Sequence, residues 1–222
     1  MIKIENTEIL GWKTFVRKME DFRLSSNKSD SWYGCTKGDY GHTEYDYCKK
    51  YCTADCRYYL GIKDLKLINS LNTDNSNKLL KMINVFCDIT APLYWWYKFG
   101  HYKPNEALKK YNLINMIEKD EFTIDNFSSE CLYDEAYDCL TGIIIILNEF
   151  RRRYLNYKDK NDFFQIQQLL PASYNVKSTI NLTYYDLKNI YFSNSISGRE
   201  EWREFKKWIE TLPYFKEICL ED

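Results

Sequence analysis

A group of cysteines with one histidine is the densest set of metal-binding side chains in the sequence. Cys35, His42, Cys48, Cys52 and Cys56 lie in one short segment. Three residues separate Cys48 from Cys52 and Cys52 from Cys56, a spacing that puts these thiols on one face of a helix. Because Zn²⁺ takes four nitrogen or sulfur ligands in a tetrahedron, the segment predicts a zinc site. The familiar zinc signature, a pair of close CxxC knuckles, is absent from the sequence. The alternative to a zinc site is therefore a row of free thiols along a helix.

A second group of candidate functional side chains follows the aromatic run 94–99. It combines a histidine with cationic, amide, carboxylate and aromatic side chains: His101, Tyr102, Lys103, Asn105, Glu106, Lys110 and Tyr111. A histidine here could orient a ring or a phosphate near neutral pH. Packing beside the aromatic run is the alternative for His101, and capping of a helix after Pro104 is the alternative for Asn105 and Glu106. The aromatic run itself is interpreted as core.

The elements that must position these residues indicate an α+β protein. Strands are expected at 2–5 and 82–89, and helices at 11–19, 62–71, 91–100, 131–157, 161–170, 179–192 and 199–211. A polar turn is expected at 72–77. The helix at 131–157 carries several isoleucines that indicate burial on more than one side. We therefore expect one domain, 1–222, in which a small sheet packs against several long helices, with a polar, cysteine-rich insertion at about 25–60.

Composition narrows the class of protein. The chain of 222 residues has a net charge of −1 and no basic stripe, which argues against dedicated DNA binding. Aliphatic runs are too short to span a membrane, and the start lacks the apolar region of a signal peptide, so a cytoplasmic location is expected. In that reducing compartment the four remaining cysteines are expected to be small core residues: Cys87, Cys131, Cys139 and Cys219.

Three segments, in order, resemble the flavin-dependent thymidylate synthases. The opening strand and helix match in pattern. That family then carries an Arg-His-Arg triplet followed by Asn-Glu and Arg-Tyr, and this sequence has Gly100-His101-Tyr102, Asn105-Glu106 and Lys110-Tyr111. The family's Leu-Pro passage and its Asn-Leu-Arg triplet are matched by 169–174 and by Asn181-Leu182-Thr183.

The resemblance implies a reaction and a set of ligands. Members of the family reductively methylate dUMP with FAD, NADPH and methylenetetrahydrofolate, no protein nucleophile is expected, and each site is built from several subunits of a homotetramer. The resemblance assigns nucleotide or cofactor binding to His101, Tyr102, Lys103, Asn105, Glu106, Lys110, Tyr111, Gln167, Ser173 and Asn181. Catalytic residues are not assigned.

Departures from the family pattern support an alternative function. Arginine is missing at four matched positions, and arginine is well suited to hold phosphate because its planar fork makes two parallel hydrogen bonds. Arg151, Arg152 and Arg153 point about 100° apart on a helix and cannot converge, so a solvated helix end is expected for them. The alternative is a non-catalytic, bacteriophage-type protein that sequesters a nucleotide, or inhibits a host defence protein, in the host cytoplasm.

Overall fold

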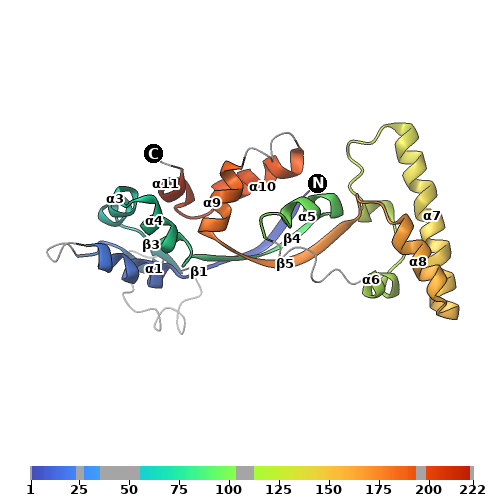
Figure 1. Cartoon of the computed structure of the whole chain (residues 1–222), viewed down its shortest axis with the longest axis horizontal. Helices are drawn as coiled ribbons and strands as arrows, with labels where there is room; N and C mark the ends of the chain where they lie inside the picture. The colour runs from blue at the N-terminus through green and yellow to red at the C-terminus, as the bar shows by residue number, and fades with distance from the viewer. Residues whose placement is uncertain (1, 24–27, 36–55, 104–112, 194–198, 221–222) are drawn as a thin grey trace. The chain divides into compact units, whose positions relative to one another are not determined.

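The computed structural model describes residues 2–23, 28–35, 56–103, 113–193 and 199–220. A three-stranded sheet has the order β1-β4-β5, with β4 in the centre (Figure 1). Its strands are β1 (Lys3–Leu10), β4 (Asn84–Pro92) and β5 (Asn175–Thr183). Two further strands, β2 (Trp32–Cys35) and β3 (Cys56–Tyr59), pair antiparallel in a separate ribbon. The predicted α+β class is confirmed.

Twelve helical segments accompany these strands among the described residues. They are α1 (Trp12–Met19), η1 (Glu20–Phe22), α3 (Ile62–Ser70), α4 (Thr73–Leu80), α5 (Leu93–Phe99), α6 (Leu113–Lys119), η2 (Ile124–Asn126), α7 (Asp134–Tyr157), α8 (Lys160–Leu169), α9 (Tyr184–Phe192), α10 (Glu200–Glu210) and α11 (Phe215–Cys219). None of the helices in the described ranges is long and apolar enough to cross a membrane.

Strands β4 and β5 run antiparallel, which two hydrogen bonds beyond their ends establish. The Tyr184 N–H donates to the carbonyl of Ile83 at 3.0 Å, and the Leu93 N–H donates to that of Tyr174 at 2.9 Å. Burial alternates along β4, where the side chains from Val85 to Ala91 in steps of two are buried and those between them are half-exposed. One face of the sheet is therefore covered and the other is open.

The backbone packs as two compact units, and all three strands of the sheet run through both. The first unit contains Met1–Thr7, Cys87–Ile180 and Ile196–Phe205, and the second contains Glu8–Phe86, Asn181–Ser195 and Lys206–Asp222. Both units are built on the same three strands. The organisation of residues 1–222 as one domain stays a prediction.

Stacked aromatic side chains form one core of the first unit. Trp95 on α5 stacks on Phe99 and on Trp202 of α10, with ring centroids 4.9 and 4.8 Å apart. Trp96, also buried, donates its indole N–H to the carbonyl of Val176 on β5 at 3.0 Å. The aromatic run is therefore core, as predicted, apart from the exposed Tyr97.

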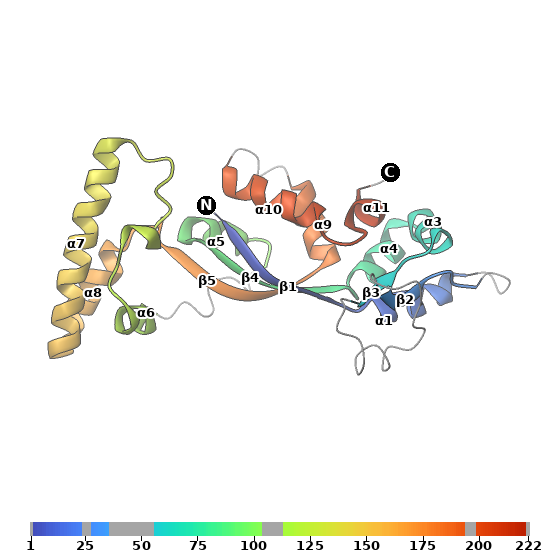
Figure 2. The same cartoon turned by 180° about the vertical axis from the view of Figure 1, so that it is seen from behind.

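A separate helical core completes the first unit. Helices α7 and α8 lie side by side (Figure 2). Buried side chains from α6, α7, α8 and the segment before α7 form this core: Leu113, Ile117, Phe122, Phe127, Leu140, Ile144, Leu147 and Ile166. The core begins only at Leu140, so the first turns of α7 extend beyond it.

The second unit packs around Trp12 and Tyr184. The four predicted apolar residues of α1 are buried: Trp12, Phe15, Val16 and Met19. The hydroxyl of buried Tyr184 donates to the carbonyl of Pro213 at 2.7 Å, which joins α9 to the segment before α11. Gly11 links β1 to α1 with a φ of 107°, and a Cβ there would collide with the backbone of Met82. Glycine is required at this turn for both reasons.

Two sequence predictions of secondary structure were wrong. Residues 72–77 begin α4 instead of forming a turn, because the side chain of Asn72 accepts a hydrogen bond from the Asn75 N–H and caps the helix. The helix expected at 179–192 begins only at Tyr184, because residues up to Thr183 pair with β4 and bury Ile180 and Leu182. Sheet pairing overrides local helix propensity there.

Two predictions of burial were also wrong. Cys87 and Cys219 are buried, as expected, and burial raises the pKa of each thiol to about 12. Cys131 and Cys139 are exposed, because they lie at and before the first turns of α7, beyond its core. Ile145 and Ile146 are 64% and 47% exposed, so α7 is not buried on several sides.

A buried carboxylate ties the base of the β2–β3 ribbon to α3. Asp64 is 1% exposed and forms an ion pair with Arg23, which is also buried. The hydroxyls of Ser29 and Ser31 donate to the same carboxylate at 2.6 and 2.5 Å. Three donors from outside the helix converge on one charge, so the two chain segments on either side of residues 24–27 are held together.

Removal of this buried charge should be costly. Asp64→Asn is expected to lower the free energy of unfolding by about 3–5 kcal/mol, because Arg23 would be left buried and unpaired. Asp21→Asn, which removes an exposed partner of Lys18 in the same unit, should cost no more than about 1 kcal/mol. Urea denaturation of both variants measures the difference, and equal losses would contradict the assignment.

Candidate functional site

The Leu-Pro passage before β5 is fixed by the start of α5. The first two N–H groups of that helix have no partners within it. They donate to the lead-in of β5, Leu93 to the carbonyl of Tyr174 and Tyr94 to that of Ala172 at 3.0 Å. The Ser128 N–H donates to the carbonyl of Ser173 at 2.9 Å. Three backbone hydrogen bonds therefore fix the backbone from Ala172 to Tyr174, which carries the side chain of Tyr174.

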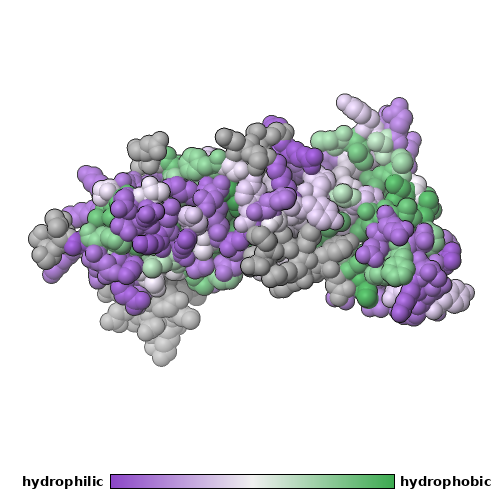
Figure 3. All heavy atoms as spheres, viewed as in Figure 1, coloured by the Kyte–Doolittle hydropathy of each residue, from purple (hydrophilic) through white to green (hydrophobic). Residues whose placement is uncertain are grey.

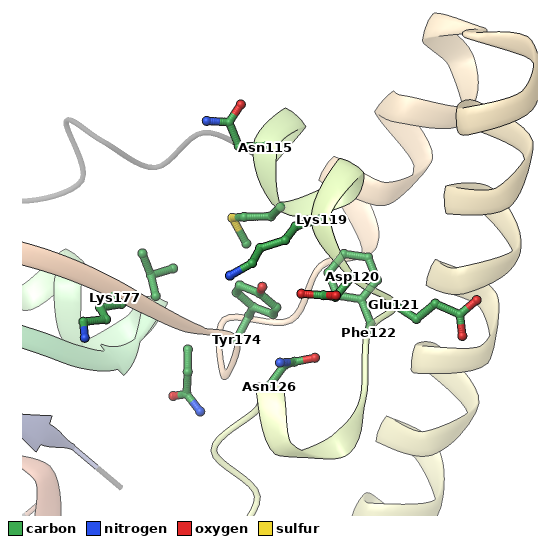
Figure 4. Close-up of a pocket in the computed structure, with 11 residues that line it drawn as sticks. Asn115, Lys119, Asp120, Glu121, Phe122, Asn126, Tyr174 and Lys177 are labelled. Carbon is green, nitrogen blue, oxygen red and sulfur yellow. The ribbon is translucent and has the colours of Figure 1, made fainter.

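A pocket of about 330 Å³ opens beside Tyr174 (Figure 4). It lies between the end of α6, the segment that leads to η2 and the start of β5, and it is lined by Asn115, Met116, Lys119, Asp120, Glu121, Phe122, Asn126, Tyr174, Asn175, Val176 and Lys177. In Figure 4 the side chains of Lys119 and Asp120 lie toward Tyr174, and those of Asn115 and Glu121 point away.

Tyr174 supplies a neutral hydrogen-bond donor to this pocket. Its ring packs edge-on against Phe122 and Phe127, with centroids 5.8 and 5.3 Å away. Burial raises the pKa of the Tyr174 hydroxyl above its ordinary value, so this group stays protonated at neutral pH. Together with the ammonium of Lys119, it can bind an anionic group or the carbonyl edge of a ring.

The two lysines of the pocket differ in how firmly they are held. Lys177 forms ion pairs with Asp88 and Glu5 at 3.3 and 3.4 Å, and the hydrogen bond with Asp88 raises the pKa of Lys177. Asp88 also accepts hydrogen bonds from Thr179 at 2.6 Å and Asn6 at 2.8 Å. Lys119 has no ion pair within the described part of the chain, so its charge is available to a ligand.

The binding residues predicted from the sequence are not gathered at this pocket. His101 is exposed in the turn after α5, Tyr102 contacts Trp202, and Lys103 is half-buried. Gln167 is exposed on α8, and Ser173 lies next to Tyr174. The four others of the second group lie outside the described residues: Asn105, Glu106, Lys110 and Tyr111.

Asn181 and Thr183 lie on β5 in the second unit. The side-chain oxygen of Asn181 is buried and has no hydrogen-bond partner among the described residues. Thr183 stands where the resembled family has an arginine, and its hydroxyl accepts from the Asp186 N–H at 3.1 Å while the Asp186 carboxylate accepts from the Thr183 N–H at 2.8 Å. This capping box begins α9, so Thr183 has a structural role and brings no cation.

The arginine triplet separates as predicted, with one correction. Arg152 pairs with Glu149 at 2.7 Å, and Arg153 pairs with Asp162 at 2.9 Å. Arg151 is not solvated, because it is buried and donates to the carbonyl of Ile117 at 2.7 Å. The positive charge of Arg151 therefore lies at the C-terminal end of α6, where the helix dipole favours a cation.

Most of the predicted zinc ligands lie outside the described residues. His42, Cys48 and Cys52 fall in the segment 36–55. Cys35 and Cys56 are opposite each other in the register of β2 and β3. Because Cys56 begins a strand, the expected helical face of three thiols does not extend to it. The residues that the structure describes contain no other cluster of metal ligands, and zinc binding stays a prediction.

Sequence reasoning missed the pocket for a physical reason. Lys119 ends a helix that was not predicted, and Asp120 and Asn126 follow it. They meet Tyr174 only through long-range packing. Tyr174 itself ends the Leu-Pro passage at 169–174. A polar, charged segment flanked by Ile117 and Phe122 was the available signal.

Comparisons with known proteins place the fold. No family model and no curated protein matches the chain. Among solved structures it is similar to flavin-dependent thymidylate synthase ThyX from Helicobacter pylori complexed with FAD and dUMP, at a TM-score of 0.50 and 18% identity over 73% of this chain and 84% of that one. A second structure of that enzyme with FAD and dUMP gives a TM-score of 0.52 and 18% identity, covering 73% and 83%. The chain has the ThyX fold.

Acid should weaken the charge network at the rim of the pocket in this ThyX fold. The hydrogen bonds from Thr179 and Asn6 lower the pKa of Asp88. This contribution to stability is complete above the unfolded pKa of about 3.9 and is lost as the pH falls through the lower folded pKa. Asp88→Asn should lower the urea midpoint at neutral pH and flatten its decline below about pH 5.

A control separates this effect from general acid unfolding. Glu8→Gln changes an exposed carboxylate of β1 that has no ion pair among the described residues, and it should keep the wild-type acid dependence. If Asp88→Asn and the wild type decline in parallel, the proposed contribution is absent.

Proposed function

We propose that this chain binds a nucleotide of the dUMP or FAD type, and that the pocket beside Tyr174 holds part of that ligand. The proposal is supported by the likeness to ThyX structures that contain FAD and dUMP. Donors suited to a phosphate or a ring carbonyl come from the protonated Tyr174, the amides of the pocket and Lys119, which has no ion pair among the described residues. If the chain is catalytic, its reaction is flavin-dependent methylation of dUMP, and the assembly is a homotetramer.

The flavin part of the proposal has a direct spectroscopic test. Purified protein should carry a flavin absorption band or acquire one when FAD is added, and dUMP should perturb that band. A bound flavin would justify an assay for thymidylate formation. A protein that stays colourless and shows no heat of binding with either ligand would contradict the proposal.

Two substitutions test the pocket itself. Lys119→Ala and Tyr174→Phe should each weaken dUMP binding about tenfold, because each removes one donor to the ligand. Lys160→Ala removes an exposed lysine of α8 in the same unit and should leave the affinity unchanged. Calorimetric titration measures all three. Wild-type affinity in both pocket variants would place the ligand elsewhere, even if a flavin is bound.

A non-catalytic function is favoured by the structural role of Thr183. A position that carries arginine in the resembled family carries the threonine that caps α9 here. The absence of that cation is therefore linked to the stability of the helix start. Under this alternative the protein, of phage type, sequesters a nucleotide or inhibits a host protein. Nucleotide binding with no thymidylate formation would support sequestration.

Metal content tests the predicted zinc site. If Cys35, His42, Cys48, Cys52 and Cys56 supply the ligands, purified protein should contain about one zinc ion per chain, and chelation should release it. A content below about a tenth of an equivalent would contradict the site. Cys87→Ala, which removes a buried thiol away from the cluster, should keep the zinc and is the matched control.

A further inference from the structure

The β2–β3 ribbon ends in two cysteines that lie directly opposite each other. From its base outward, the pairs of the ribbon are Trp32–Tyr59, Tyr33–Tyr58, Gly34–Arg57 and Cys35–Cys56. The Cα atoms of opposite residues in an antiparallel pair are about 4.5 or 5.5 Å apart, depending on whether the pair is hydrogen-bonded. A disulfide requires about 4.4–6.8 Å between its Cα atoms. The register therefore brings the two cysteines within reach of a disulfide.

Contacts at the base of the ribbon fix this register. The rings of Trp32 and Tyr59 stack with their centroids 4.4 Å apart. The Gly61 N–H donates to the hydroxyl of Ser31 at 3.0 Å, and the same hydroxyl donates to the buried carboxylate of Asp64. A slip of one residue would separate the stacked rings and would move one cysteine to the other face of the ribbon. The base therefore holds the cysteines opposite each other at the far end.

We propose that Cys35 and Cys56 form a reversible disulfide by exchange with a small oxidised thiol such as glutathione disulfide. The thiolate of one cysteine attacks a sulfur of glutathione disulfide, the bond between its sulfurs breaks, and one glutathione leaves and takes up a proton. The thiolate of the other cysteine then attacks the protein sulfur of this mixed disulfide and releases the second glutathione. Two protein thiols are oxidised, and one glutathione disulfide is reduced to two thiols.

The two cysteines are sufficient for a disulfide but not for a zinc centre. Zn²⁺ takes four ligands, and the described part of the chain contains no cluster that could complete the set. Zinc at this pair would need His42, Cys48 or Cys52, which lie outside the described residues. The two states exclude each other, because the thiolate is the metal ligand and a disulfide has none. Closure of the pair would therefore release zinc held by Cys35 and Cys56.

A disulfide here would act as a sensor of redox conditions. In a reducing compartment such a pair stays as thiols and closes only when oxidised thiols accumulate. Figure 3 shows mostly hydrophilic surface around α3, the helix that holds the base of the ribbon, which suits the approach of a charged, water-soluble thiol. The inference does not rest on nucleotide binding, because it is drawn from the β2–β3 ribbon alone.

Peptide mapping after exposure to glutathione disulfide tests which cysteines pair. The full chain, first reduced and freed of metal, should gain a bond between Cys35 and Cys56 that dithiothreitol reopens. Cys48→Ser and Cys52→Ser are the matched controls, and each should keep this bond. Absence of the bond in the wild type, or its replacement by a bond to Cys48 or Cys52, would overturn the proposal.

The equilibrium with glutathione tests the register. The folded chain should close the bond about a hundredfold more favourably than the chain in urea, because a disulfide that stabilises the fold is favoured by the fold to the same extent. Gly34→Cys combined with Cys35→Ser moves the thiol to the other face of the ribbon. In this variant the equilibrium constant for a bond to Cys56 should fall to the value in urea. Equal constants for the folded and unfolded wild type would contradict the proposal.

Discussion

The pairing of β4 with its neighbours is the constraint on which the rest of the molecule depends. As the central strand, β4 has partners on both sides, and its alternating burial makes one face of the sheet apolar and leaves the other polar. A shift of one residue would move Cys87 and Ile89 to the open face and Asp88 into the core. The covered face then determines where the aromatic helices pack, and the open face carries the ion pair between Asp88 and Lys177.

The pocket follows from this pairing through the helix that begins where β4 ends. Because α5 starts at Leu93, its unpaired N–H groups are directed at the lead-in of β5, and they hold Tyr174 by its backbone. The side chain of Tyr174 is then free to form a wall of the pocket, supported by Phe122 and Phe127. The Tyr174 wall of the pocket is thus positioned by backbone hydrogen bonds between the start of α5 and the lead-in of β5.

Local pattern was enough to predict much of the fold and little of the site. The apolar face of α1, the aromatic core of α5 and α10 and the end of α8 at Leu169 all follow from spacing within one segment. The exception at 179–183 shows the limit, because those residues are a strand only through pairing with β4. The meeting of Lys119 and Tyr174 could not be predicted for the same reason, since nothing local relates residues so distant in sequence. Exposure of Ile146 could not be predicted because the spacing of apolar residues on a helix does not show which of its faces the fold covers.

The replacement of arginine by other residues determines what binding this fold can provide. Arginine grips a phosphate through two fixed hydrogen bonds, whereas the ammonium of Lys119 is a point charge on a flexible stem. Binding through Lys119 is therefore expected to be weaker and more sensitive to salt than binding through a guanidinium. Thr183→Arg would remove the cap of α9 and lower stability, so the start of this helix opposes an arginine at position 183. The sheet and the helix caps hold this fold together, and neither requires an arginine at that position.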